Sequence, residues 1–269
     1  MKNKYALFTC DTEFTPPWNS GSWKSQDPWT FEVGIEVITN ILSKHQIRGT
    51  FFCVATLVEQ YPKKVKALSL NHLVGCHSYN HENYGGRPVK VWTDSQPILI
   101  KDDEEKRRLL IKAKKIIRNV IGKEPEVFVA PFDCIDTQLL KILENLNFKV
   151  DCSYHNYSLG LQTHFFQPIG FNILELPLSV VYCGNKLTYK NVLEAFTFDK
   201  KNLQAILQQD IIMITCHPYE YTNITIPHPQ EVLIVGEKKK KALEDLIVLL
   251  KNNNYEFIDI LQLKDRVLL

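Results

Sequence analysis

Two histidines in the segment 75–82, GCHSYNHE, have the spacing for metal chemistry. His77 and His81 stand four residues apart, and neutral imidazole is the most common protein ligand for zinc, iron, cobalt or nickel. Two rings at this spacing can reach one ion. The pair alone is weak evidence, because a chain with eight histidines contains close pairs by chance. A loop whose histidines bond to backbone groups is the alternative.

Acidic residues and a third histidine extend this chemistry. Asp11 and Glu13 follow the apolar run 5–10, and His217 follows the apolar run 211–216. Two histidines and one carboxylate form a facial set that holds a catalytic metal ion and leaves positions open for water and substrate. A second carboxylate could take a proton from the attacking water, and a remote histidine could protonate the leaving group. The combination predicts metal-assisted hydrolysis of an amide or ester.

These residues are far apart in the sequence, so a regular alternation of strands and helices must bring them together. We expect strands at 5–10, 48–54, 72–76, 126–130, 148–153, 173–177, 179–182, 211–216 and 255–258. We expect helices at 30–45, 57–68, 102–121, 137–146 and 239–251, and two short helices within 189–209. Apolar runs of this kind indicate parallel strands that are buried on both faces and joined by helices.

At least six such units in one chain of 269 residues favour an α/β barrel that forms a single domain over residues 1–269. A nucleotide-binding sheet is the lesser alternative, because no glycine-rich phosphate loop follows the first strand. In a parallel barrel the carboxyl ends of the strands lie at one rim, where active sites form. The residues at or just past these ends are Asp11, Glu13, His77, His81, Pro131, Phe132, Asp151 and His217. We therefore expect them to converge.

The motifs resemble the polysaccharide deacetylase family, the NodB-like carbohydrate esterases, over essentially the whole chain. The family motif His-(Ser/Thr)-x-x-His is matched fully by HSYNH at 77–81, and the acidic motif of the first strand by TCDTE at 9–13. Weaker matches are VAPF at 129–132, VDCS at 150–153 and ITCHP at 214–218. The resemblance implies a distorted (β/α)7-like barrel and a divalent metal, most often zinc, with cobalt or nickel as alternatives. It also implies the removal of N- or O-acetyl groups from sugars.

Carried over to this sequence, the resemblance implies that His77 and His81 are metal ligands, that Asp11 is the general base and that His217 is the general acid. It implies that the backbone N–H of Phe132 helps to hold the oxyanion. Asp151 would belong to the shell that orients and charges a catalytic histidine.

Three features depart from the family pattern. Asp11-Thr12-Glu13 stands where the family has two adjacent aspartates, so Glu13 is the expected carboxylate ligand, and the opposite assignment to Asp11 stays open. Val129 stands where a family arginine tethers the catalytic base. The loops 18–29, which contains three tryptophans, and 77–86 predict a reshaped groove whose substrate cannot be copied from the family.

The balance of charge and hydropathy bounds the class of protein. Lys and Arg total 32 and Asp and Glu total 30, so nothing favours a nucleic-acid or membrane-surface partner. No apolar window of about eighteen residues predicts a membrane span, and no signal-peptide pattern is visible, so we expect a cytoplasmic protein. The seven cysteines are expected to be free thiols, and Cys10, Cys76 and Cys216, at strand ends, are expected to point away from the site. The lysine run 238–241 and Glu82 are expected to be solvated.

Two classes of function follow. The favoured one is a metal-dependent deacetylase that acts on an N-acetylated sugar or on a precursor of surface polysaccharide such as O-antigen. The alternative is a catalytically silent relative that kept the barrel and binds glycan, motivated by Thr12 and Val129. A hydrolase of a small amide on the same barrel is a further variant. The oligomeric state is left open.

Overall fold

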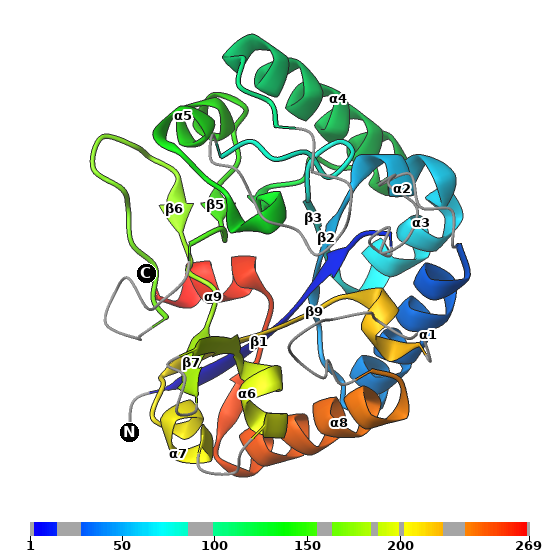
Figure 1. Ribbon diagram of the computed structural model, residues 1–269, viewed down its shortest axis with the longest axis vertical. Helices are drawn as coiled ribbons and strands as arrows, with labels where there is room; N and C mark the ends of the chain where they lie inside the picture. The colour runs from blue at the N-terminus through cyan, green and yellow to red at the C-terminus, as the bar shows by residue number, and fades with distance from the viewer. Residues whose placement is uncertain are drawn as a thin grey trace.

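The computed structural model describes residues 3–14, 28–85, 99–154, 163–183, 188–198, 202–222 and 235–267. Figure 1 shows a curved sheet with helices packed around its outer side. The strands of this sheet are β1 (Lys4–Thr12), β2 (Thr50–Cys53), β3 (Leu73–Cys76), β4 (Val127–Phe128), β5 (Val150–Asp151), β6 (Leu174–Glu175), β9 (Ile211–Cys216) and β10 (Tyr255–Phe257). A separate antiparallel hairpin joins β7 (Val180–Cys183) to β8 (Thr188–Asn191).

The helices alternate with these strands. They are α1 (Pro28–Lys44), α2 (Ala55–Gln60), α3 (Pro62–Asn71), α4 (Asp103–Ile121), α5 (Thr137–Asn145), α6 (Val192–Phe198), α7 (Asn202–Leu207), α8 (Glu237–Asn252) and α9 (Ile260–Val267). Short 3-10 helices follow β4 at Pro131–Asp133 and β9 at Pro218–Tyr221. None of the helices in the described ranges has the length and apolar character that a membrane crossing needs.

The main sheet is parallel in each of its strand pairs. Its order is β10-β1-β2-β3-β4-β5-β6, and β9 also pairs with β1. The sheet curls into a half-barrel, so the predicted α/β class with a distorted barrel is confirmed. Because the strands run in one direction, the residues that follow β1, β3 and β9 lie at one edge of the sheet.

Both faces of the sheet are buried, as the continuous apolar runs indicate. Along β1, Ala6 and Phe8 pack outward with helix residues, whereas Tyr5 and Leu7 pack into a second, inner cluster. Cys10, which continues the outward series, is fully buried in the same outer cluster as Cys76 and Cys216. These thiols therefore face away from the inner side of the sheet, as predicted. No disulfide forms among the six cysteines that the described residues include with their side chains.

Several element boundaries differ from the prediction. The helix expected at 57–68 is two helices, because Pro62 has no N–H to continue α2 and instead begins α3. The helix expected from Thr30 begins at Pro28. By contrast, α4 ends at Gly122 as expected, with φ of 82°, and Asp102 caps its start by accepting from the N–H of Glu105 at 2.7 Å.

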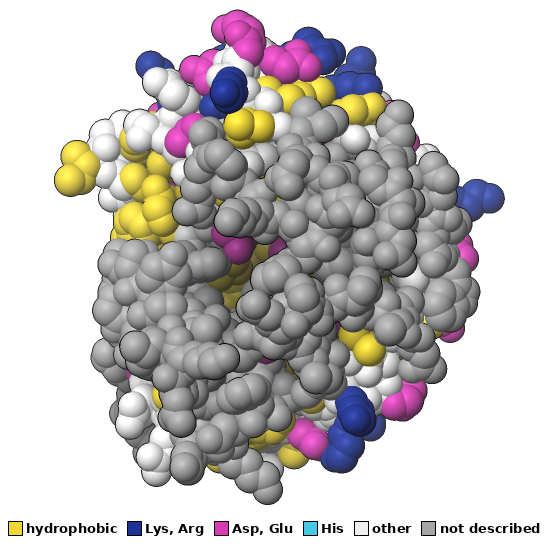
Figure 2. Space-filling model, viewed as in Figure 1, with side chains coloured by type: hydrophobic (Ala, Val, Ile, Leu, Met, Phe, Trp, Pro, Cys, Tyr) yellow, Lys and Arg dark blue, Asp and Glu magenta, His cyan; other side chains and the backbone are white. Residues whose placement is uncertain are grey.

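Figure 2 shows one face of the molecule with side chains coloured by type. Lys and Arg side chains intermix with Asp and Glu at the upper end of this view, so no field of one sign forms there. This pattern agrees with the near-neutral net charge of the sequence. Near the centre of the same view, acidic and hydrophobic side chains are visible in a hollow. The tryptophan loop 18–29 lies, for residues 18–27, outside the described residues.

Candidate metal site

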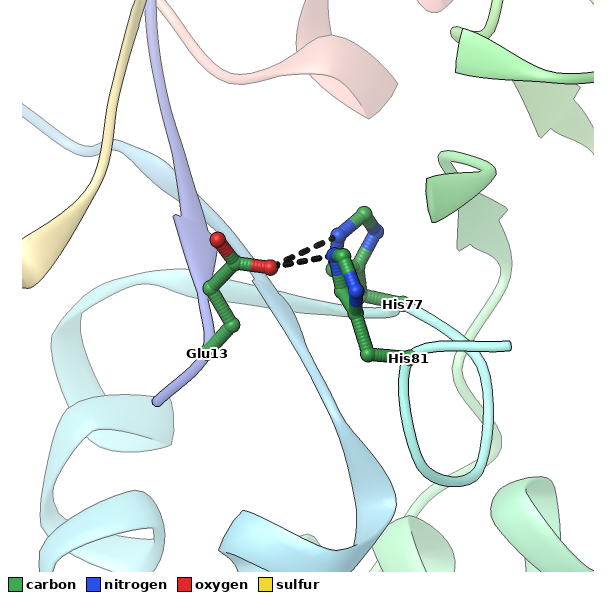
Figure 3. A group of neighbouring side chains, drawn as sticks. All are labelled: Glu13, His77 and His81. Carbon is green, nitrogen blue, oxygen red and sulfur yellow. Dashed lines mark ion pairs between the residues drawn. The ribbon is translucent and has the colours of Figure 1, made fainter. Parts of the chain in front are cut away.

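Glu13, His77 and His81 form a cluster at the carboxyl edge of the sheet (Figure 3). Glu13 follows β1 directly, and the two histidines follow β3. His81 Nε2 lies 2.5 Å from Glu13 Oε2, and His77 Nε2 lies 3.6 Å from the same oxygen. The three ligand atoms lie within 4.8 Å of one another, and all three side chains are buried. The structure thus brings together the residues that the sequence nominated as ligands.

A tight turn explains how two histidines four residues apart face one point. Ser78 and His81 both have positive φ, 68° and 59°, which folds the chain back on itself. The Ser78 hydroxyl accepts from the N–H of His81 at 2.8 Å and holds this turn. Glu82, expected to be solvated, is buried instead, where it accepts from the N–H of Asn80 and from the Tyr84 hydroxyl, each at 2.9 Å. That prediction was wrong, because the turn uses Glu82 as an internal acceptor.

The orientation of the His77 ring is fixed by a backbone group. Its Nδ1 lies 2.8 Å from the Val129 carbonyl oxygen, and because a carbonyl only accepts, Nδ1 carries the proton. When His77 is neutral, its Nε2 therefore carries the lone pair that a metal ligand requires, and this atom faces Glu13. Val129, which stands where the family has an arginine, thus contributes its main-chain carbonyl to the site.

The cluster fits a divalent transition metal on the chemistry of its donors. Glu13 Oε2 is buried and accepts no hydrogen bond from the residues that the structure describes, although two imidazoles face it. Burial alone would raise the pKa of Glu13, but the imidazoles of His81 and His77 outweigh burial and lower this pKa below its usual range. An ionised carboxylate beside two nitrogen ligands is the two-histidine, one-carboxylate set that suits zinc, iron, cobalt or nickel.

Asp11 lies beside this cluster without being part of it. Its carboxylate is buried, and Asp11 Oδ2 lies 3.9 Å from His217 Nε2. Burial raises the pKa of Asp11 above its ordinary value, and the positive charges of His77 and His217 offset part of this effect. Asp11 is therefore a more basic carboxylate than Glu13, which lies two residues further along the chain, just past β1.

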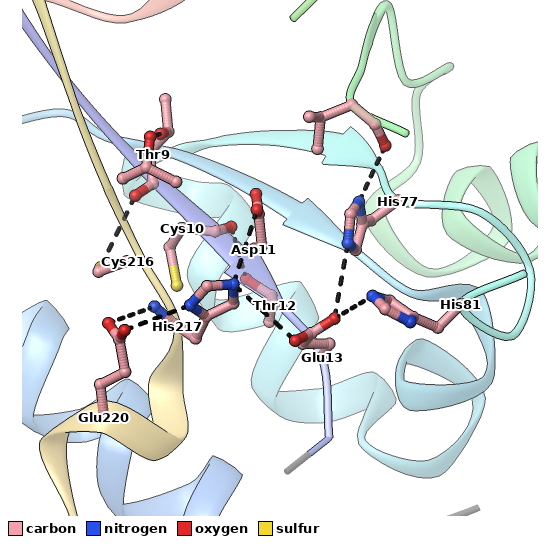
Figure 4. Close-up of polar contacts among 12 residues, drawn as sticks. Thr9, Cys10, Asp11, Thr12, Glu13, His77, His81, Cys216, His217 and Glu220 are labelled. Carbon is pink, nitrogen blue, oxygen red and sulfur yellow. Dashed lines mark hydrogen bonds and ion pairs between the residues drawn. The ribbon is translucent and has the colours of Figure 1, made fainter. Parts of the chain in front are cut away.

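His217 follows β9 and connects Asp11 and Glu13 to a third acid, Glu220, as Figure 4 shows. His217 Nδ1 lies 3.5 Å from Glu220 Oε1, and the N–H of His217 donates to the other Glu220 oxygen at 3.0 Å. Burial would lower the pKa of His217, but the Glu220 carboxylate, followed by Glu13 and Asp11, raises it to about 10. The Tyr219 ring stacks on the imidazole with centroids 5.0 Å apart. His217 is thus a protonated side chain at neutral pH.

Glu220 and Lys239 are site residues that the sequence did not identify in these roles. Lys239 Nζ lies 3.2 Å from Glu220 Oε2, and both side chains are almost fully buried. The prediction that the lysine run 238–241 is solvated holds for Lys238 and Lys241 but is wrong for Lys239. A signal was present, because Lys239 lies three, four and seven residues before buried apolar residues of α8, on the face that packs inward.

Phe132 and Asp151 take different places. Phe132 adopts φ of 60° in the 3-10 helix after β4, and its ring meets the His81 ring edge to face at 4.6 Å. Asp151 bonds to Ser153, through the serine N–H at 3.1 Å and hydroxyl at 2.7 Å. The carboxylate that reaches His217 Nδ1 is Glu220, so an effect of Asp151 on a catalytic histidine stays a prediction.

Comparisons with known proteins agree with this geometry. Residues 29–150 match the family model of polysaccharide deacetylase. Peptidoglycan-N-acetylglucosamine deacetylase of Bacillus cereus is 28% identical over 143 residues, which are 51% of this chain and 46% of that protein. Peptidoglycan deacetylase of Helicobacter pylori is 28% identical over 127 residues, which are 46% of this chain and 39% of that protein. The alignments therefore span less than half of the length of these relatives.

The fold extends the likeness over the rest of the chain. A polysaccharide deacetylase-like crystal structure from Mycobacterium smegmatis superimposes with a TM-score of 0.67 at 16% identity, covering 98% of this chain and 91% of that one. The matched segment contains His77 and His81, whereas Asp11, Glu13 and His217 lie outside it and reach the same site through the fold. The resemblance to the polysaccharide deacetylase family seen in the sequence motifs is thus confirmed by the family model over residues 29–150.

Proposed function

We propose that the protein is a metal-dependent deacetylase that hydrolyses the N-acetyl group of an N-acetylglucosamine-containing glycan or glycan precursor. The observation that carries this proposal is the buried set of Glu13, His77 and His81, with Asp11 and His217 next to it. Two relatives whose names specify deacetylation of peptidoglycan support the amide of an N-acetyl sugar as the target.

In this proposal Glu13, His77 and His81 hold the divalent ion, and zinc is the expected metal, with cobalt or nickel as alternatives. When bound, the ion would supply Lewis-acid polarisation of the acetyl carbonyl. The His77 imidazole is already oriented, since the Val129 carbonyl fixes its tautomer.

The acid and base steps fall to Asp11 and His217. Asp11 takes a proton from the attacking water, a role that suits a buried carboxylate with a raised pKa. His217 is protonated at neutral pH and gives its Nε2 proton to the leaving amine. The backbone N–H of Phe132 is the proposed donor to the developing oxyanion. Asp11 Oδ2 and His217 Nε2 lie 3.9 Å apart, so both groups can reach one substrate amide.

Two substrates present the same amide. One is N-acetylglucosamine in a polymer such as peptidoglycan, as in the names of the two relatives. The other is a nucleotide- or lipid-linked N-acetyl sugar on the way to a surface polysaccharide such as O-antigen, which fits the predicted cytoplasmic location. The location and the choice between these substrates are part of the proposal.

Acetate release tests the proposal. The metal-loaded protein is incubated with N-acetylglucosamine oligomers, peptidoglycan and a nucleotide-linked N-acetylglucosamine, and free acetate is measured before and after chelation. We expect release from at least one substrate, its loss on chelation, and its loss in His217→Asn with metal still bound. Glycan binding without acetate release would support the alternative of a catalytically silent, glycan-binding barrel. Turnover of small amides alone would support a small-amide hydrolase.

A further inference from the structure

A buried peptide unit connects His77 to a serine near another strand. The His77 ring donates from Nδ1 to the Val129 carbonyl at 2.8 Å. The N–H of Ala130, which belongs to the same peptide unit, donates to Ser153 Oγ at 2.7 Å. Because the peptide is planar and rigid, the hydroxyl at one end restrains the carbonyl at the other. Ser153 therefore helps to hold the acceptor that orients His77.

Asp151 holds Ser153 in turn. The Ser153 hydroxyl donates to Asp151 Oδ1 at 2.7 Å, and its backbone N–H donates to Asp151 Oδ2 at 3.1 Å. With its hydrogen committed to the carboxylate, the serine oxygen is left as the acceptor for the N–H of Ala130. The bonds therefore run in one direction, from His77 and the peptide to the carboxylate.

A second acid faces Asp151 across the sheet. Asp151 and Glu175 are in register on the parallel strands β5 and β6, and both are fully buried. Burial and then the charge of Asp151 raise the pKa of Glu175 to about 12, so Glu175 is a neutral acid. Burial also raises the pKa of Asp151, to about 6, although the neighbouring side chains of Glu175 and Ser153 lower it. At neutral pH the pair keeps its negative charge on Asp151.

The whole chain of bonds lies away from water. Its members are each at most 2% exposed: His77, Val129, Ala130, Ser153, Asp151 and Glu175. Solvent therefore cannot replace a bond that is removed, and bonds in such a low-dielectric chain polarise one another. Loss of the serine hydroxyl would leave the Ala130 N–H without an acceptor and the peptide free to tilt.

We propose that Ser153 and Asp151 are positioning residues for the metal ligand His77, acting through the peptide between Val129 and Ala130. The inference rests on the proposed metal site and names residues that set the affinity of that site. Outer contacts of this kind typically change metal affinity by about 10–100-fold when removed. Each bond in the chain has a length expected of a well-made hydrogen bond.

The chain offers a matched control. Ser179 is also buried, and its hydroxyl also accepts from a backbone N–H, that of Met213 at 2.8 Å. Ser153→Ala and Ser179→Ala thus remove the same kind of bond from the same kind of environment. The backbone that Ser179 holds is in the middle of β9 rather than beside a ligand. Asp151→Asn is the second test variant, since it keeps the shape and removes the charge.

The first measurement is the affinity for Co²⁺ by calorimetry on the full chain. We expect Ser153→Ala and Asp151→Asn to bind Co²⁺ about tenfold or more weakly than the wild type. Ser179→Ala should stay within about twofold of the wild type. Equal affinities for Ser153→Ala and Ser179→Ala would overturn the proposal.

The second measurement separates this inference from the proposed function. In the metal-free protein, the Nδ1 proton of His77 is followed by NMR, and its exchange with water is timed. We expect slow exchange in the wild type and in Ser179→Ala, and exchange at least about tenfold faster in Ser153→Ala. An unchanged rate in Ser153→Ala would refute the positioning role even if the enzyme proved active. Lack of deacetylation with the expected NMR change would remove the proposed function and leave the positioning intact.

Discussion

Replacing Glu220 by glutamine removes the carboxylate that lies 3.5 Å from His217 Nδ1 while keeping its size. Three carboxylates raise the pKa of His217 from 6.5 to about 10 against its burial. Asp11 and Glu13 stay in place, each 3.9 Å from Nε2, so only part of the rise is lost. A neighbouring opposite charge shifts a pKa by about 1–3 units, which places His217 in the variant between about 7 and 9.

The assay is the pH dependence of kcat for deacetylation. His217 must carry its proton to act as the acid, so activity is lost at alkaline pH as the pH rises through the pKa of His217. A bound cation would offset the charge of Glu13, which places this alkaline limb of the pH profile below about 10. We expect the alkaline limb to move down by about 1–3 pH units in Glu220→Gln. For a limb that starts near 10, kcat should fall by about twofold or less at pH 7, and at pH 9 by about twofold for a shift of about 1 pH unit and about 90-fold for a shift of about 3 pH units.

Two further variants keep this test clear of folding defects. Glu220→Gln leaves the buried Lys239 without its closest acid, so Glu220→Gln/Lys239→Met is measured beside it. Asp259→Asn is the control, because Asp259 is also buried and ion-paired, with Arg48 Nε at 2.5 Å. We expect Asp259→Asn to lower stability without moving the alkaline limb. An unmoved limb in both Glu220 variants would refute the reasoning.

Three other predictions follow from the same geometry. Asp11→Asn should lower kcat by about 100-fold or more with metal retained, and metal loss in Asp11→Asn would make Asp11 a ligand. In the wild type, the acid limb of the pH profile should lie above pH 3.8, because burial raises the pKa of Asp11. Gly34→Ala would place its Cβ 1.9 Å from the Pro218 carbonyl oxygen, so urea unfolding should show a loss of about 1–3 kcal/mol or more, with a lower kcat because Pro218 adjoins His217. The folded-state pKa of Glu220 is about 2, against 4.5 ordinarily, because the charges of Lys239 and His217 outweigh burial. Glu220 therefore adds stability above pH 4.5 that is lost as the pH falls toward 2. The free energy of unfolding of Glu220→Gln, measured with denaturant, should depend less on pH in this range.

The ligand cluster could be predicted from the sequence because its residues follow strands. A parallel sheet fixes which ends of strands meet, so Glu13 after β1 and the histidines after β3 had to share one edge. The apolar runs gave the strands, since a sheet buried on both faces needs them. Strands β4 and β5 are shorter than the predicted strands 126–130 and 148–153. Beyond β4, the N–H of Ala130 bonds to the Ser153 hydroxyl instead of continuing the sheet.

The partners of His217 could not be predicted in the same way. Glu220 meets Lys239 only because the 3-10 helix after β9 packs against α8. The spacing of Lys239 to the apolar residues of α8 indicates that it turns inward, but it does not indicate which acid it meets. The family resemblance implied Asp151 as the acid behind a catalytic histidine. Its bonds go to Ser153, and the histidine that this route reaches is His77, through a peptide unit that no side-chain pattern reveals.

The metal content of four purified proteins, by elemental mass spectrometry, tests the central claim most directly. Wild type, Asp11→Asn, Glu13→Gln and His77→Ala/His81→Ala are each offered zinc and then freed of excess metal. The predicted result is close to one ion per chain in the wild type and in Asp11→Asn, with little or none in the other two. No ion in the wild type, or an ion retained without Glu13 and both histidines, would contradict the account.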